Sequence, residues 1–317
     1  MSANHDTRVL SFVDILHAKR LAENGTVLNT AIRCTAAAGG VDTGLIKSML
    51  PHTSRYTLMA RYDGQHVVGQ FYITHDTPVA RLVYLAPQMR PNTDDSAWLV
   101  LLDAIVKEAG KRGAHVLTGE VDEDSELFTT MRQSGFAVYA RQTLWLYQGD
   151  ASADLPPRVD IREARTNDTN RIYGLYRRTV PRLMQQVETL PEISGFVYCV
   201  NDNVMGFVHT ATGRDGVLLT PYIDVDAPVG ATQVLTETAR HVSNIQAQPI
   251  MVRVTRHQNW LSGSLADDGF ECVAHQAVMV RHIAAGIHTP EFERLEKKLA
   301  ANPAKRQTGE LPEVGMN

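Results

Sequence analysis

Several features that mark whole classes of protein are scarce in this sequence of 317 residues. It has only 3 cysteines, and Cys34, Cys199 and Cys272 are too few and too far apart for a disulfide framework or a zinc site. We therefore expect reduced thiols that pack inside a cytoplasmic protein, and no metal. No apolar run approaches the roughly 18 residues of a membrane span, and the first ten residues contain no apolar targeting segment.

An excess of one charge is also missing. The 31 Lys and Arg residues nearly balance the 35 Asp and Glu residues, which leaves a net charge of -4. Because no dense basic run is present, the electrostatic surface that a nucleic-acid binder needs is absent. We expect a small-molecule or protein partner, neither nucleic acid nor membrane, and a monomer or homodimer.

The sequence does contain a repeat. The phrase GFAVYARQ (135–142) returns as GFECVAHQ (269–276), with glycine, phenylalanine, alanine and glutamine at a constant offset. A β-hairpin, a strand, a helix, a strand and a second helix precede each phrase. These elements are expected over 60–73, 80–87, 97–113, 115–121 and 125–135 in the first half, and over 198–210, 217–225, 230–245, 249–255 and 259–269 in the second.

The repeat predicts two domains, and 44% apolar residues are enough for two cores. The stretch 149–158, rich in Pro, Gly, Ala and Asp, is the expected linker. It separates an N-terminal domain (1–148) from a C-terminal domain (159–285), which is followed by a short helix and polar tail (286–317). Strands 80–87 and 217–225 are expected at equivalent central positions of two separate sheets.

The order of elements and the helix-to-GF phrases MRQSGF and LADDGF resemble the GNAT superfamily of acyl-CoA-dependent N-acyltransferases. The resemblance covers about 1–148 and 158–285. It implies an α+β fold of two tandem GNAT-like domains, each a mixed, mostly antiparallel sheet flanked by helices. It also implies acetyl transfer from acetyl-CoA, as co-substrate, to an amine of a small molecule or protein. The alternative is a non-catalytic tandem scaffold or ligand-binding protein.

The resemblance also implies where coenzyme A would bind. In GNAT proteins a Gly-rich turn opens the helix after the fourth strand, and its free backbone N–H groups bind the pyrophosphate. In the first half, Ser96 and Trp98 stand in place of small residues, and Asp94 and Asp95 place negative charge on the same donors. These aspartates suit helix N-caps better. The first half is therefore not expected to bind coenzyme A in the usual way.

The second half is more permissive and is the expected active half. Gly230, Ala231 and Thr232 open its helix, although Asp226 stands where the family has Gln or Arg. The pantetheine arm would pair with the end of the preceding strand as an added strand does. The expected cofactor-binding residues are Ile223, Val225, Gly230, Ala231, Thr232 and Asn259.

The family's usual acid, a tyrosine four residues before the GF glycine, is missing from both halves. Met131 and Leu265 stand there instead. Acyl transfer needs a base for the amine and an acid for the thiolate. Tyr222, Asp224 and His257, with His209 a further candidate, lie beside the expected cleft and are the residues expected to replace the missing groups. Each of these side chains also suits a plain packing role in a strand.

Overall fold

The computed structural model describes residues 5–9, 18, 20–21, 24–35, 54–74, 77–148, 159–188, 193–228, 230–245 and 248–283. The expected linker 149–158 and the C-terminal segment 286–317 lie outside the described residues. Residues 1–283 form one compact unit.

A single 13-stranded sheet runs through both halves, in the order β1-β3-β4-β5-β6-β13-β7-β12-β11-β10-β9-β8, with β2 paired to β5 beside this path. The expectation of two separate sheets is therefore wrong. The strands are β1 (His5–Val9), β2 (Thr26–Val27), β3 (Arg55–Tyr62), β4 (Gln65–Ile73), β5 (Val79–Ala86), β6 (Val116–Asp122), β7 (Ala137–Tyr147), β8 (Ile161–Glu163), β9 (Gly195–Val200), β10 (Asn203–Thr212), β11 (Val217–Ile223), β12 (Ile250–Thr255) and β13 (Phe270–His282).

Within this sheet each half has the predicted mixture of parallel and antiparallel strands. Among the described strands, the pairs β5–β6 and β11–β12 are parallel and the others are antiparallel. The prediction of mixed, mostly antiparallel GNAT-like sheets is confirmed.

The two predicted hairpins turn on residues with positive φ. Asp63 and Gly64 (φ 45° and 81°) connect β3 to β4, and Asn201 and Asp202 (φ 48° and 63°) connect β9 to β10. Two-residue turns with positive φ at both positions match the right-handed twist of the strands that they join. Gly, Asn and Asp tolerate this conformation best, which is why the sequence marks these turns clearly.

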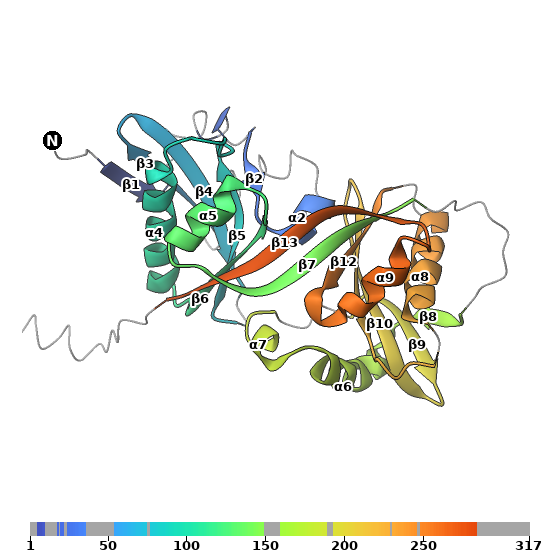
Figure 1. Ribbon diagram of the computed structural model, residues 1–317. Helices are drawn as coiled ribbons and strands as arrows, with labels where there is room; N and C mark the ends of the chain where they lie inside the picture. The colour runs from blue at the N-terminus through green and yellow to red at the C-terminus, as the bar shows by residue number, and fades with distance from the viewer. Residues whose placement is uncertain are drawn as a thin grey trace, which may run out of the picture. The chain divides into compact units, whose positions relative to one another are not determined.

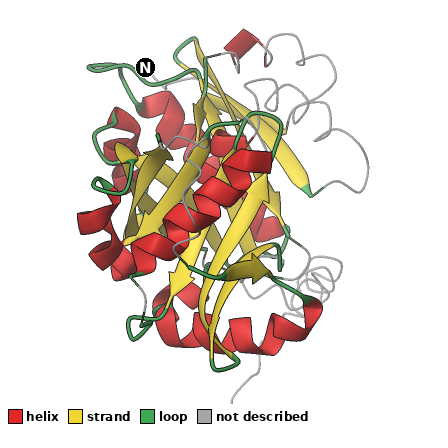
Figure 2. Ribbon diagram, turned by 90° about the vertical axis from the view of Figure 1, so that its right-hand side faces the viewer, coloured by secondary structure: helices red, strands yellow, loops and turns green. Residues whose placement is uncertain are grey.

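Helices cover both faces of the sheet (Figure 2). In the C-terminal half, α8 packs its apolar side on β11 residues such as Leu219 and Ile223. On the opposite face, α6 packs on Phe207 and Tyr222. The helices are α2 (Thr30–Thr35), α4 (Ser96–Lys111), α5 (Glu126–Gln133), η2 (Thr166–Asp168), α6 (Thr169–Thr179), α7 (Arg182–Gln185), α8 (Ala231–Ile245), η3 (Arg256–Leu261) and α9 (Ser262–Leu265).

The halves exchange the strands that follow their GF phrases. Strand β13 of the second half pairs with β6 of the first half, and β7 of the first half pairs with β12 of the second half. Between them β7 and β13 pair with each other and lie side by side across the molecule (Figure 1). An ion pair from Arg281 on β13 to Asp103 on α4 (3.5 Å) further ties β13 to the first half.

The recurring phrases meet at the centre of this β7–β13 pair, which we call the seam. Gln142 lies directly opposite Gln276, and its Nε2 donates to Gln276 Oε1 (3.0 Å) and to Thr30 Oγ1 (3.1 Å). Each phrase also begins with a glycine that ends a helix, since Gly135 and Gly269 have φ of 88° and 87°. The two copies of the repeated phrase thus lie on the two strands that pair with each other at the seam.

The cysteines are all free. Cys34 is buried, where burial raises its thiol pKa to about 11, and Cys199 packs partly buried against the α6 cluster. Cys272 is exposed, so the predicted packing role is wrong for this thiol. No helix in the described part of the chain is long and apolar enough to cross a membrane.

The strand exchange predicts that neither half folds alone. Residues 1–148 and 159–283, produced separately, should each lack cooperative thermal unfolding, because each loses the partner strand that buries its edge. Mixed during refolding, they should recover one cooperative transition. A cut introduced into the folded chain within 149–158 is the matched control and should leave the transition in place. Cooperative unfolding of isolated 1–148, measured by circular dichroism, would show that the seam is dispensable.

Candidate active site

The parallel strands of the first half separate along their length. Strands β5 and β6 are paired from Val79 to Arg81 and from Val116 to Thr118, and no further pairing joins them beyond these residues. We call the space between their separated ends the N-terminal wedge. Separated strands leave backbone N–H and C=O groups to be satisfied by another segment or ligand.

The chain fills the N-terminal wedge with its own backbone. Strand β2 pairs with Tyr84 and Leu85 of β5. Next along the chain, Leu28 N donates to Val83 O (2.8 Å) and Leu28 O accepts from Glu120 N of β6 (2.9 Å). One peptide segment therefore bridges both strands on the edge where an added strand would pair. Coenzyme A does not fit this wedge while the segment is in place.

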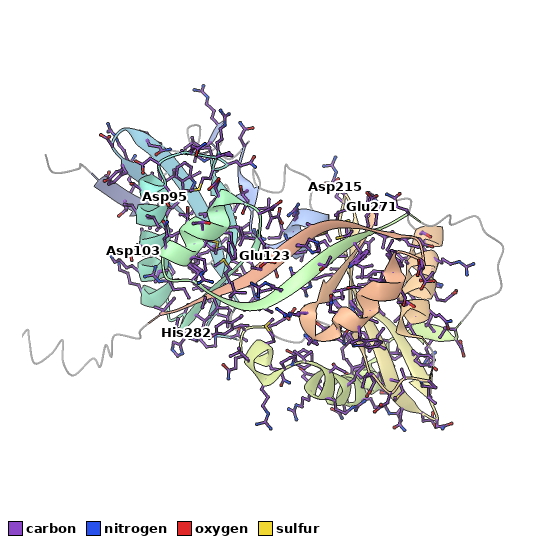
Figure 3. The ribbon with its side chains drawn as sticks, viewed as in Figure 1. Asp95, Asp103, Glu123, Asp215, Glu271 and His282 are labelled. Atoms are coloured by element: carbon purple, nitrogen blue, oxygen red, sulfur yellow. The ribbon has the colours of Figure 1, made fainter. Side chains whose placement is uncertain are left out.

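The start of α4 also argues against coenzyme A binding in the first half, although not every expected reason holds. Asp94 accepts hydrogen bonds from Ser96 Oγ (2.7 Å) and Ser96 N (3.1 Å), which lower the pKa of its carboxyl group. Asp95 (Figure 3) holds the N-cap position, but its carboxylate accepts from Thr130 (3.1 Å). The expectation that Trp98 obstructs the helix start is wrong, because its side chain is 2% exposed and packs in the core.

The C-terminal wedge, between the separated ends of β11 and β12, holds a side chain instead of a strand. The parallel pairing ends at Leu219 and Val252. Gln258, on η3, is 2% exposed and enters from the β12 side. With its amide oriented to suit its neighbours, Nε2 donates to Pro221 O (3.0 Å) and Oε1 accepts from Ile223 N (3.1 Å). The Gln258 amide therefore hydrogen-bonds to the backbone of β11, where the pantetheine arm is expected to pair.

The expected cofactor-binding residues lie around this wedge and the start of α8. Their assignment remains a prediction. Ile223 is buried, Val225 is 72% exposed, Gly230 is exposed just before α8, Thr232 is half-buried, Ala231 begins the helix, and Asn259 is exposed and accepts from Ser262 Oγ.

In the described part of the chain, no hydrogen bond joins the three expected catalytic residues to one another. Tyr222 is buried. Asp224 pairs with Arg178 (2.8 Å); burial raises the pKa of this carboxyl, but the hydrogen bonds it accepts outweigh burial and lower it overall. His257 is half-buried beside Thr255, and burial lowers its pKa. Their catalytic roles also stay predictions.

A cavity of about 170 Å³ lies where the two halves meet, and Tyr222 lines it. A smaller cavity of about 40 Å³ adjoins it and shares five of its lining residues. The larger cavity, called the central cavity below, is lined by Asn29, Ala31, Tyr72, Arg81, Glu120, Glu188, His209, Ala211, Leu218, Thr220, Tyr222 and Arg253.

Arg253 is the electrostatic centre of the central cavity. Its guanidinium donates to Glu188 Oε1 (2.7 Å) and to Glu120 Oε1 (3.3 Å). Burial alone would lower the pKa of Arg253, but the two carboxylates hold it above its ordinary value. Sequence analysis missed these residues. A lone charge inside an apolar strand, as in VLTGEV and IMVRVT, was the available signal.

Two further groups on the cavity wall are held uncharged. Burial, aided by Arg253, lowers the pKa of His209 to about 4. Burial and the nearby Glu188 raise the pKa of Tyr222. The Tyr222 hydroxyl lies near Arg253 but meets good hydrogen-bond geometry with no described group. The cavity therefore presents a neutral imidazole and a protonated phenol next to the charged residues. Among the described residues no cluster of His, Cys, Asp and Glu has metal-binding geometry.

The fold is similar to solved N-acetyltransferases. A GCN5-related N-acetyltransferase from Sphaerobacter thermophilus has a TM-score of 0.57 at 13% identity, over 89% of this chain and 97% of that chain. A tandem GNAT protein from the clavulanic acid biosynthesis pathway has 0.55 at 15% identity, over 89% and 99%. A glucosamine N-acetyltransferase region of a fungal multi-domain β-N-acetylglucosaminidase has 0.56 at 10% identity, over 89% and 38%.

These likenesses establish the fold: the chain has the GNAT fold in tandem, as the sequence predicted. No family model matches the chain, and no curated protein matches it in sequence.

The low pKa of His209 predicts an acid-sensitive fold. In the unfolded chain a histidine titrates near its ordinary pKa of about 6.5, whereas the folded value is about 4. The unfolded state therefore binds more protons between these values, and stability falls as pH drops from about 6.5 to 4. His209→Gln should reduce the loss of unfolding free energy between pH 7.5 and 5 by up to about 2 kcal/mol.

Urea denaturation at the two pH values measures this loss. His115→Gln, at an exposed position outside the central cavity, is the matched control and should keep the wild-type loss. An identical loss in the His209→Gln variant would place this imidazole in a more hydrated environment than the structure gives it.

Proposed function

Because the chain has the GNAT fold in both halves, we propose that it is an acyl-CoA-dependent N-acyltransferase whose C-terminal half takes acetyl-CoA. The observation that carries the proposal is the difference between the wedges. The N-terminal wedge is closed by main chain that bonds both strands, whereas one side chain, Gln258, holds the C-terminal wedge. A side chain vacates its position by rotating, whereas a paired strand has to unzip.

The donor site would use backbone groups of the C-terminal half. The start of α8, at Gly230, Ala231 and Thr232, offers unpaired N–H groups and the positive end of the helix dipole to the pyrophosphate. The pantetheine arm would replace the Gln258 amide on β11 near Ile223 and Val225. When bound, acetyl-CoA supplies a thioester carbonyl that is open to attack by an amine.

The central cavity is the matching acceptor site, because it lies across the sheet from α8. Side chains alternate between faces along a strand. On β11, Leu219 and Ile223 face α8, whereas Leu218, Thr220 and Tyr222 line the central cavity. A donor bound on the α8 side and threaded through the wedge would present its acyl end to the cavity.

The cavity residues suit the two proton transfers of the reaction. Tyr222 stays protonated at neutral pH, so its hydroxyl can donate a hydrogen bond and then a proton to the departing thiolate; the raised pKa weakens this acid, and the nearby Arg253, which lowers the pKa, would assist the transfer. The neutral imidazole of His209 is an uncharged proton acceptor on the wall. Asp224 and His257 remain candidates at the edge of the wedge.

Calorimetry with acetyl-CoA on three variants tests the donor site. Gln258→Ala should tighten binding by about fivefold, because it removes a competing amide worth roughly 1 kcal/mol of net hydrogen bonding. Gly230→Trp should abolish binding, because an indole at the exposed helix start covers its N–H groups. Thr93→Trp, at the exposed approach to α4, is the matched control in the first half and should bind like wild type.

Equal losses in the Gly230→Trp and Thr93→Trp variants would mean that the cofactor was assigned to the wrong half. Absence of binding in wild type and in Gln258→Ala alike would favour the alternative, a non-catalytic scaffold or ligand-binding protein. One observation supports that alternative: both wedges have an intramolecular occupant.

The acid is tested by Tyr222→Phe, which removes one hydroxyl and keeps the ring that stacks on Phe207. The acetyl-transfer rate should fall by at least about tenfold, with little change in acetyl-CoA affinity, because general acid catalysis typically contributes about a hundredfold or more. Steady-state kinetics across an amine panel measures the rate. Tyr139→Phe, the matched control, removes a hydroxyl that pairs with His282, outside the cavity lining. An unchanged rate in Tyr222→Phe would remove this phenol from the mechanism.

A further inference from the structure

The charges of the described residues on the wall of the central cavity balance. Arg81 and Arg253 are positive and Glu120 and Glu188 are negative, while His209, with a pKa of about 4, is neutral at physiological pH. A ligand with net charge would upset this balance. An uncompensated charge held against this wall is unfavourable, which argues against polyamines and phosphorylated ligands.

The same charges are unbalanced locally. Glu120 and Glu188 share one guanidinium, that of Arg253. Arg81 donates to the backbone oxygen of Val187 (2.9 Å), and no described carboxylate lies within ion-pair distance of it. Glu120 and Glu188 together therefore carry an excess negative charge over Arg253, and Arg81 carries a positive charge without a described carboxylate partner. A ligand with one ammonium and one carboxylate would compensate both.

The size and walls of the cavity limit the ligand further. A cavity of about 150 Å³ holds a benzene molecule, so the central cavity, at about 170 Å³, takes roughly six to eight non-hydrogen atoms. Tyr72 and Tyr222 supply aromatic walls. Tyr222 also brings a buried hydroxyl, which lies beside Arg253, to this wall.

We infer that the central cavity binds a small zwitterionic amino acid, with its carboxylate at Arg81 and its ammonium at the Glu188 carboxylate, on the oxygen that does not accept from Arg253. As an assignment of the acceptor class, this rests on the proposed function; as a binding site, it stands on the cavity alone. Charge-assisted hydrogen bonds to both ends of the ligand would contribute the larger part of the affinity.

Calorimetry with purified full-length protein and four probes tests the site. L-alanine and L-serine, which are zwitterions, should bind, whereas propionate and L-alaninol, each with one of the two charges, should bind at least tenfold more weakly. Arg81→Met should weaken L-alanine binding by about tenfold or more, because it removes the carboxylate partner. Arg90→Met, the matched control at an exposed position after β5, should bind like wild type. Arg81→Lys keeps the charge and should retain part of the affinity.

Comparable binding of propionate or L-alaninol, or equal losses in Arg81→Met and Arg90→Met, would overturn the inference, as would the absence of any zwitterion binding by wild type. Should Arg81→Met fail to fold, the probe comparison on wild type and the Arg81→Lys variant decides the matter. Zwitterion binding without acetyl transfer supports the site and contradicts the proposed enzyme. Transfer to amines that lack a carboxylate, at undiminished rate, supports the enzyme and contradicts this site.

Discussion

The antiparallel pairing of β7 with β13 is the constraint on which the rest of the molecule depends. It joins what would be two sheets into one, because each of these strands also pairs with a strand of the opposite half. The central cavity exists only because this pairing brings the two halves together. Arg81 and Glu120 come from the first half, and Glu188 and Arg253 from the second. The chemistry of the cavity is therefore a property of the complete chain.

Much of the fold could be predicted from the sequence because local signals are strong. The hairpins turn at Asp63-Gly64 and Asn201-Asp202, where backbone conformation selects the residue type. Helices α4 and α8 lie within two residues of their predicted bounds, because apolar periodicity marks them. The strand exchange was not predicted, since β7 has the same alternation whether its partner strand is near or distant in the sequence.

The site was harder to predict, because its groups are assembled by distant contacts. Tyr222 was selected from the sequence and does line the central cavity, but Arg81, Glu120, Glu188 and Arg253 were missed. The direction of the Trp98 side chain was also missed. The sequence gives the position of this residue on α4, but it does not show that the ring turns into the core. Gln258 gave no signal, because a glutamine in a short loop is ordinary until the strand that it bonds is known.

The two glutamines of the seam have a further consequence. An antiparallel pair of equivalent strands is the contact by which two identical subunits join in an isologous dimer, where a residue on the symmetry axis meets its own copy. Gln142 and Gln276 meet in this way inside one polypeptide. A true dimer has to use both copies alike. Here a single Thr30 hydrogen-bonds both glutamines from one side, and the first half contributes a segment that fills its own wedge. Because the two halves belong to one polypeptide, equivalent positions need not stay alike, and the halves are free to differ in what fills their wedges.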